Sequence, residues 1–215
     1  MPVKISLYYD SVSPYSWLAF EVLQRYQSTW GYELSLKPFF LGGIMQGSGN
    51  QPPAFIPSKA KYMQSDLPRN GKLFNVPLNF PTAFPVSTLK AQRALTYIKL
   101  HHPEKLADAS RGLWKSYWSQ NKNISLDTDI LAVLQPLLPN PDKILTSTSD
   151  PQIKDELLRT TKEALDQGAF GAPWIEVEQE DGRKIYFWGS DRFEQMAMVL
   201  GKRWYGPLGR VEAKL

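Results

Sequence analysis

A short run near the start of the chain, Ser13-Pro14-Tyr15-Ser16, joins two different hydrophobic patterns. Apolar residues alternate over residues 3–9, a period of two that predicts a strand. Over residues 17–26 they recur at four-residue spacing, which predicts a helix with one apolar face. Ser13 suits the N-cap of that helix and Pro14 its first position, where a missing N–H costs no hydrogen bond. A second strand is expected at 34–40, so the chain opens as β-α-β.

The middle of the chain differs from this opening. Residues 42–85 are rich in Gly, Pro and Asn, and a long irregular excursion is expected there. Residues 86–167 carry apolar residues at helical spacing and are expected to be helical. Within them, Asp150-Pro151 is expected to start a helix and Gly168 to stop it.

The end of the chain returns to strands. Two strands are expected at 174–178 and 184–188, around the tight-turn signal Glu180-Asp181-Gly182. Ser190 is expected to cap a last helix whose inner face ends at Leu200.

This order predicts an α/β fold. It is the order of a thioredoxin-like domain, β-α-β and then β-β-α, formed by residues 1–55 and 168–215 and interrupted by an inserted all-helical domain, 56–167. Such folds place a reactive C-x-x-C pair between the first strand and its helix. Here serines hold that spacing, and the chain has no cysteine. Disulfides, thiol redox catalysis by the protein and cysteine-based zinc sites are therefore excluded, and a reactive sulfur must arrive on a ligand.

Composition sets further bounds. With 215 residues and 42% hydrophobic content, the chain can bury a core as one domain with an insert. No apolar stretch approaches the ~18 residues of a membrane-spanning helix, and the first strand starts too early for a signal peptide to be expected. The net charge of +4 is spread out, without the basic stripe of a nucleic-acid-binding protein. We expect no metal site.

Ser13 is the first candidate site residue. The N-terminus of a helix presents unpaired N–H groups and a positive dipole end, which favour an anion such as a thiolate. The Ser13 hydroxyl can donate one more hydrogen bond to it. The alternative is that Ser13 is only an N-cap, and the two interpretations are compatible.

Two further segments offer polar contacts. Pro173, in Phe170-Gly171-Ala172-Pro173-Trp174, suits either a cis peptide bond, whose preceding residue can pair its backbone with a ligand, or an ordinary trans bond at a strand edge. Ser190 and Asp191 could bind the carboxylate and ammonium of an α-amino acid, or simply open a helix.

The Gly-rich run Gly47-Ser48-Gly49-Asn50 lacks the spacing of a phosphate-binding loop. Together with Lys59 it could form a lid that reaches a carboxylate. The aromatic stripe of Trp114, Tyr117 and Trp118 favours core packing over a ligand wall.

Taken together, these residues resemble the kappa class of glutathione transferases over nearly the whole chain. The wider family includes glutathione-dependent 2-hydroxychromene-2-carboxylate isomerases and, further off, DsbA-like oxidoreductases. The resemblance is carried by Tyr9-Asp10, Ser13-Pro14-Tyr15-Ser16-Trp17, Gly43-Ile44-Met45 running to Gly49-Asn50 and Pro52-Pro53, Gly168-Ala169-Phe170-Gly171 before Pro173, and Gly189-Ser190-Asp191-Arg192.

The resemblance implies a homodimer that uses glutathione as co-substrate, and it implies roles for individual residues. Ser13 would be the catalytic residue, with Pro14 and Tyr15 beside it in the glutathione site. Ala172, before a cis Pro173, would pair its backbone with the cysteinyl part, although the family often has a larger apolar residue there. The other implied contacts are Ser190 and Asp191 to the γ-glutamyl end, Asn50 nearby, Lys59 to the glycine carboxylate, and Asp66 to the site of a partner subunit.

The function expected is conjugation of the glutathione thiolate to small electrophiles in detoxification, with peroxide reduction as a related activity. The alternatives are a glutathione-dependent isomerase and a non-enzymatic binding module on a thioredoxin-like fold. The last residues, Ala213-Lys214-Leu215, are a close variant of a peroxisomal signal. Because the family occurs in peroxisomes and mitochondria, a peroxisomal location is expected, with mitochondrial or cytosolic as the alternatives.

Overall fold

The computed structural model of the chain describes residues 2–209. The C-terminal tripeptide Ala213-Lys214-Leu215 lies outside the described residues. None of the helices within 2–209 is both long and apolar enough to cross a membrane.

A four-stranded mixed sheet forms the centre of the molecule. Its strands are β1 (Lys4–Tyr9), β2 (Glu33–Pro38), β3 (Trp174–Glu178) and β4 (Lys184–Trp188). They lie in the order β2-β1-β3-β4, with β1 parallel to β2 and β3 antiparallel to both of its neighbours. The β-α-β opening and the terminal β-hairpin are therefore confirmed, and Gly182 has the positive φ of 83° that an Asp-Gly turn uses.

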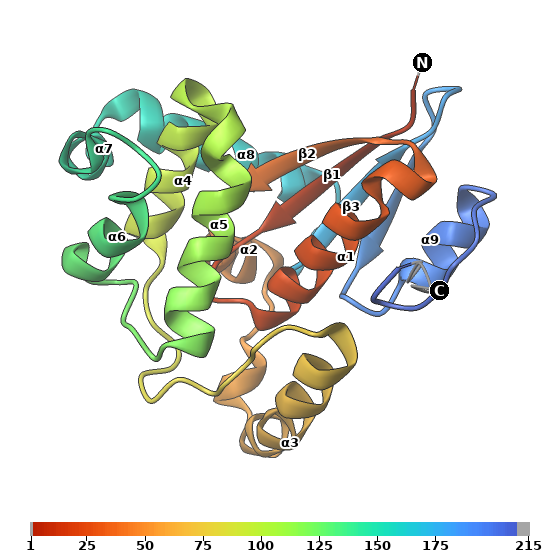
Figure 1. Ribbon diagram of the computed structural model, residues 1–215, viewed down its shortest axis with the longest axis horizontal. Helices are drawn as coiled ribbons and strands as arrows, with labels where there is room; N and C mark the ends of the chain where they lie inside the picture. Colours follow the sequence, from red (N-terminus) through yellow and green to blue (C-terminus); the bar gives the residue numbers. More distant parts are fainter. Residues whose placement is uncertain (1, 210–215) are drawn as a thin grey trace, which may run out of the picture.

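Helices account for most of the remaining chain. They are α1 (Pro14–Trp30), α2 (Leu41–Ser48), α3 (Pro57–Phe74), α4 (Leu89–His101), α5 (Leu106–Trp114), α6 (Asp127–Leu134), α7 (Pro141–Ser147), α8 (Pro151–Asp166) and α9 (Phe193–Val199), with short turns η1 (Pro53–Phe55), η2 (Pro103–Lys105) and η3 (Lys115–Ser119). Figure 1 shows α4 to α7 grouped beyond the end of the sheet at which β1 and β2 terminate, with α3 projecting on its own and α9 on the opposite side.

The expected irregular excursion at 42–85 is wrong, because it contains η1, α3 and all but the first residue of α2. The prolines in this segment favoured irregular structure over a helix. Pro57 occupies the first turn of α3, where a missing N–H is tolerated, and Pro68 stands inside the helix. The helix is retained because one face is buried, with Met63, Leu67 and Phe74 in the core.

The expected cap of the last helix is also wrong. Helix α9 begins at Phe193 after Arg192, and no side chain caps it. Gly189, at φ 101°, turns the chain out of β4, and Ser190 and Asp191 form the bend that follows, so the helix starts further on. At α8, Asp150 does stand at the N-cap position, although its side chain makes no capping hydrogen bond.

The two faces of the sheet pack against different helices. Ile5, Leu7 and Tyr9 belong to a large apolar cluster that also holds buried residues of α1, α4, α5 and α9. Tyr8 points to the other face, into a smaller cluster with residues of α2 and α8. The aromatic stripe of Trp114, Tyr117 and Trp118 is fully buried in the larger cluster, which confirms core packing.

Candidate functional site

Ser13 lies where β1 ends and α1 begins. It is the N-cap of α1, with extended backbone angles, and its Oγ accepts a hydrogen bond from the Ser16 N–H at 3.1 Å. The same hydroxyl donates to the carbonyl oxygen of Ala172 at 3.3 Å. The side chain is buried, and it joins the N-terminus of α1 to a loop 159 residues further along the chain.

That loop contains the Ala172–Pro173 peptide bond, which is cis, the form that the kappa-class resemblance implied and that the local sequence left open. The antiparallel pairing of β1 with β3 sets Tyr8 opposite Trp174, so the start of β3 lies at the end of β1 from which Ser13 follows. The Gly189 N–H donates to the Pro173 carbonyl at 3.2 Å. The structure therefore brings Ser13, the cis proline and the chain just before Ser190 together.

Ser190 and Asp191 differ in their exposure. Ser190 is buried, whereas the Asp191 side chain is 67% exposed and bonds Arg192 Nη1 at 2.8 Å. An exposed carboxylate paired with a partly exposed cation can exchange that partner for a ligand ammonium, because surface ion pairs contribute little.

Asn50 reaches the same region from the chain after α2. Its side-chain Nδ2 donates to the Phe170 carbonyl at 2.7 Å, and its Oδ1 accepts the Gln51 N–H at 2.8 Å. Gly49, at φ 71°, makes the turn that delivers it. Asn50 thus lies beside the loop that contains Ala172.

Tyr15, Lys59 and Asp66 meet at the junction of α1 and α3. A cavity of about 280 Å³ lies between these helices and is lined by Tyr15, Pro53, Ser58, Lys59, Tyr62 and Met63. The Tyr15 hydroxyl donates to Asp66 Oδ2 at 2.8 Å. Burial, and then the bond to Asp66, raise the pKa of the Tyr15 hydroxyl far above its usual value, so it stays a neutral donor. The expected reach of Asp66 to a partner subunit stays a prediction.

Asp10, which sequence analysis noted only as part of a motif, supports the loop before Ser13. It is fully buried and accepts hydrogen bonds from the Val12 N–H (3.0 Å), the Leu41 N–H (2.9 Å) and the Thr88 hydroxyl (2.6 Å). Burial raises the pKa of the Asp10 carboxyl to about 6, against these bonds, which lower it. An acidic residue directly after a buried strand was the signal that could have singled it out.

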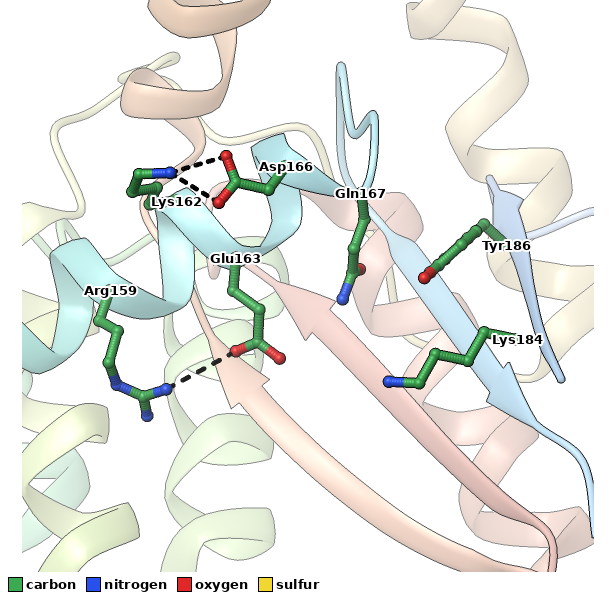
Figure 2. A pocket seen from close by; sticks show the side chains of 7 residues that line it. All are labelled: Arg159, Lys162, Glu163, Asp166, Gln167, Lys184 and Tyr186. Carbon is green, nitrogen blue, oxygen red and sulfur yellow. Dashed lines mark hydrogen bonds and ion pairs between the residues drawn. The ribbon is translucent and has the colours of Figure 1, made fainter. Parts of the chain in front are cut away.

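A larger cavity, of about 560 Å³, lies between α8 and β4 and is lined by none of the predicted site residues. Figure 2 shows Arg159 directed at Glu163 and Lys162 at Asp166 along α8, with Lys184 and Tyr186 facing them from β4. Lys184 pairs with the buried Glu176 at 3.1 Å. Because these cations are already neutralised by acidic neighbours, the cavity has the character of a solvated surface network.

Within residues 2–209, no group of three or more His, Asp or Glu side chains is arranged to hold a metal ion.

Comparison with known proteins gives consistent results. The family model for the DsbA-like thioredoxin domain matches residues 4–201. Glutathione S-transferase kappa 1 of Homo sapiens is 40% identical over 97% of this chain and 95% of its own length. A 2-hydroxychromene-2-carboxylate isomerase of Sphingobium xenophagum is 24% identical over 93% of this chain and 99% of its own length. A solved structure of such an isomerase superposes with a TM-score of 0.80 at 20% identity, covering 92% of this chain and 94% of that one.

Proposed function

Because this chain belongs to the DsbA-like thioredoxin-domain family and is a kappa-class glutathione transferase, we propose that it activates the glutathione thiol at Ser13 and transfers the resulting thiolate to small electrophiles. The observation that carries this proposal is the position of Ser13. Its hydroxyl stands at the N-terminus of a 17-residue helix and within 3.3 Å of the backbone before a cis proline, in a chain without cysteine.

Thiolate stabilisation follows from the chemistry of that position. The first turn of α1 has N–H groups without intrahelical partners, and the helix dipole favours negative charge there. The Ser13 hydroxyl accepts from the Ser16 N–H, which polarises its O–H bond, and its proton would turn from the Ala172 carbonyl to a sulfur anion bound there. Lowering the thiol pKa by about two units requires about 2.7 kcal/mol of preferential stabilisation, which one charge-assisted hydrogen bond and the helix terminus together can supply.

The other predicted residues fit the remaining parts of the tripeptide. The backbone of Ala172 would pair with the cysteinyl residue as an added strand. Ser190 and Asp191 would hold the γ-glutamyl end, with Asn50 nearby, and Pro14 would lie beside the thiol next to Ser13. Lys59, in the cavity it shares with Tyr15, would hold the glycine carboxylate.

The variant Ser13→Ala tests the proposal. We expect it to bind glutathione but to lose most of its turnover with an aryl halide, because the thiolate loses its hydroxyl donor. Calorimetry measures binding, and ultraviolet absorbance of the bound thiolate measures its pKa. Ser16→Ala is the matched control, since the Ser16 hydroxyl is equally buried and has no hydrogen-bond partner. Conjugation by Ser13→Ala at a near-wild-type rate would contradict the proposed role of Ser13. An equal loss of turnover in Ser16→Ala would contradict it too.

Isomerisation is the second candidate activity, favoured by the likeness to 2-hydroxychromene-2-carboxylate isomerases. There the thiolate would add to a substrate and leave it again, so glutathione would not be consumed. Parallel assays with a chromene carboxylate, an aryl chloride and an organic peroxide separate isomerase, transferase and peroxidase activity. A protein that binds no glutathione at all would leave only the binding-module alternative.

We further propose a homodimer located in peroxisomes and serving detoxification. The kappa-class resemblance supports the dimer, and the C-terminal Ala213-Lys214-Leu215 supports the location. Sedimentation of the purified protein tests the first. A fluorescent fusion with and without the last three residues tests the second, and an unchanged cellular distribution would contradict it.

A further inference from the structure

Gln92, on the first turn of α4, has the densest set of hydrogen bonds near the site. Its Nε2 donates to the carbonyls of Tyr9 (2.8 Å) and Phe39 (2.9 Å). Its Oε1 accepts from the hydroxyl of Ser11 at 2.9 Å and from the N–H of Ser11 at 3.3 Å. A carboxamide has two N–H donors and an oxygen with two lone pairs, so its full capacity is used. The side chain is completely buried.

These bonds lie where the sheet stops. The register of β1 with β2 ends at Tyr9 and Pro38, and the Phe39 N–H still donates to the Tyr9 carbonyl at 3.0 Å. Beyond that point the two parallel strands separate and point toward α4 and α5 (Figure 1). Gln92 therefore gives the Tyr9 carbonyl a second donor, supplies a donor to the Phe39 carbonyl beyond the last bond of the ladder, and holds Ser11 against both.

Two more side chains from the helical insert hold the same loop. The Thr88 hydroxyl donates to Asp10 Oδ1 at 2.6 Å, and Trp118 Nε1 donates to the Ser11 carbonyl at 3.3 Å. The Asp10 carbonyl in turn accepts the Ser13 N–H at 3.0 Å. A continuous set of hydrogen bonds thus runs from the insert, through residues 10 and 11, to Ser13.

We propose that Gln92 is a positioning residue for thiolate activation: by fixing Ser11 and the ends of β1 and β2, it sets where the Ser13 hydroxyl and the first turn of α1 stand relative to Ala172. The inference rests on the proposed function. A hydroxyl and a helix N-terminus stabilise an anion only within hydrogen-bond distance, so a loosely held loop weakens both at once. A residue that never touches glutathione therefore controls the pKa of its bound thiol.

The variant Gln92→Met tests this, because it keeps the length of the side chain while removing all four hydrogen bonds. We expect the pKa of the bound thiol to rise by about one unit, equivalent to about 1.4 kcal/mol. At pH values below the wild-type pKa, kcat should then fall about tenfold, because the thiolate fraction falls by that factor. KM for glutathione should change far less, since Ala172, Ser190 and Asn50 are unaltered. If Gln92 served only the fold, stability would fall while the pH profile of the folded enzyme stayed in place.

Thr96→Val is the matched control. Thr96 is buried one turn further along α4, and its hydroxyl donates to the Gln92 carbonyl within the same helix at 2.8 Å. It should keep the wild-type pH profile. If Gln92→Met fails to fold, Ser11→Ala decides instead, because it removes one of the four bonds and should raise the thiol pKa by a smaller amount in the same direction.

An unchanged thiol pKa in folded Gln92→Met, or in Ser11→Ala where that variant decides, overturns the inference. An equal shift in Thr96→Val does so too. If the wild-type protein itself leaves the thiol pKa of glutathione unshifted, the proposed function fails, and the inference fails with it.

Discussion

Ser13 combines two roles at the scale of a single residue. Its Oγ accepts the Ser16 N–H as a helix cap and also provides the hydroxyl proposed to donate to the thiolate. Capping uses a lone pair of the oxygen and donation uses its proton, which in this structure bonds the Ala172 carbonyl and would turn from it to a bound thiolate. The interpretations that sequence alone left open are therefore both compatible with this geometry.

Substitution separates the two roles. Ser13→Ala should lower the free energy of unfolding by about 1 kcal/mol, whereas Ser13→Gly should lower it by only a few tenths, because glycine is tolerated at the N-cap. Both should lose thiolate activation equally. Urea unfolding and turnover of the two variants provide the measurement. Turnover restored in Ser13→Gly would show that the cap, and not the hydroxyl, is what catalysis needs.

Asp10 gives the protein a predictable dependence on pH. The folded state releases the Asp10 proton near pH 6, whereas its ordinary pKa is 3.8, so folding takes up a proton between these values. The contribution of Asp10 to stability is therefore greatest below about pH 4 and falls as pH rises to about 6. The fall is on the order of 3 kcal/mol at most.

Comparison with Asp10→Asn isolates this effect. The variant leaves the Leu41 N–H without its acceptor and should be less stable at every pH, but it lacks the titrating group. The difference in unfolding free energy between wild type and variant should shrink as pH rises from about 4 to 7. A difference that stays constant, or grows, contradicts the raised pKa of Asp10.

At the scale of elements, α3 contains Gly71, whose substitution by alanine should destabilise the protein even though alanine has the higher helix propensity. In an exposed helix, Gly→Ala stabilises by about 1 kcal/mol. A Cβ on Gly71 would instead lie 2.9 Å from the Val76 carbonyl oxygen and 3.3 Å from the Leu78 Cβ. We expect Gly71→Ala to destabilise by about 1–3 kcal/mol, because backbone must shift to make room.

Ser65→Ala, at an exposed position of the same helix, serves as the control and should be neutral or slightly stabilising. Because α3 carries Lys59, which we propose to hold the glycine carboxylate, Gly71→Ala should also weaken glutathione binding. Denaturant unfolding and calorimetry measure the two effects, and a Gly71→Ala protein as stable as wild type would disprove the close packing.

The same helix shows what sequence could and could not predict. Alternation at 3–9 and spacing at 17–26 were sufficient for β1 and α1, because their patterns are local. Helix α3 was missed because its formation depends on burying Met63 and Leu67 against other elements, which outweighs Pro68. Gln92 was missed for a related reason. A polar residue in a helical pattern is normally solvated, and only the tertiary fold places it under the strand ends.

At the scale of the whole molecule, the helical insert shares its core with the thioredoxin-like part. One buried cluster contains Phe20 and Leu23 of α1 together with Leu95 and Trp114 from the insert. Arg111 of α5 also binds both carboxylate oxygens of Glu21, at 2.8 and 3.3 Å. Neither part can lose its structure without exposing apolar surface of the other.

Unfolding should therefore be a single cooperative transition, even though the chain exceeds the size at which two-state behaviour is usual. Separate unfolding of the insert would expose the apolar surfaces of α1 and β1 to water, at a free-energy cost of about 25 cal/mol per Å². Tryptophan fluorescence reports on both parts, because Trp17 lies in α1 and Trp118 in the insert, and far-ultraviolet circular dichroism reports on the helices. The two signals should give coincident midpoints in urea, and saturating glutathione should move both together, since ligand binding stabilises only the folded state. Two separated midpoints, or a shift of one signal alone, would mean that the insert unfolds independently, and the hydrogen bonds from α4 to the loop before Ser13 could then not hold the site in a fixed geometry.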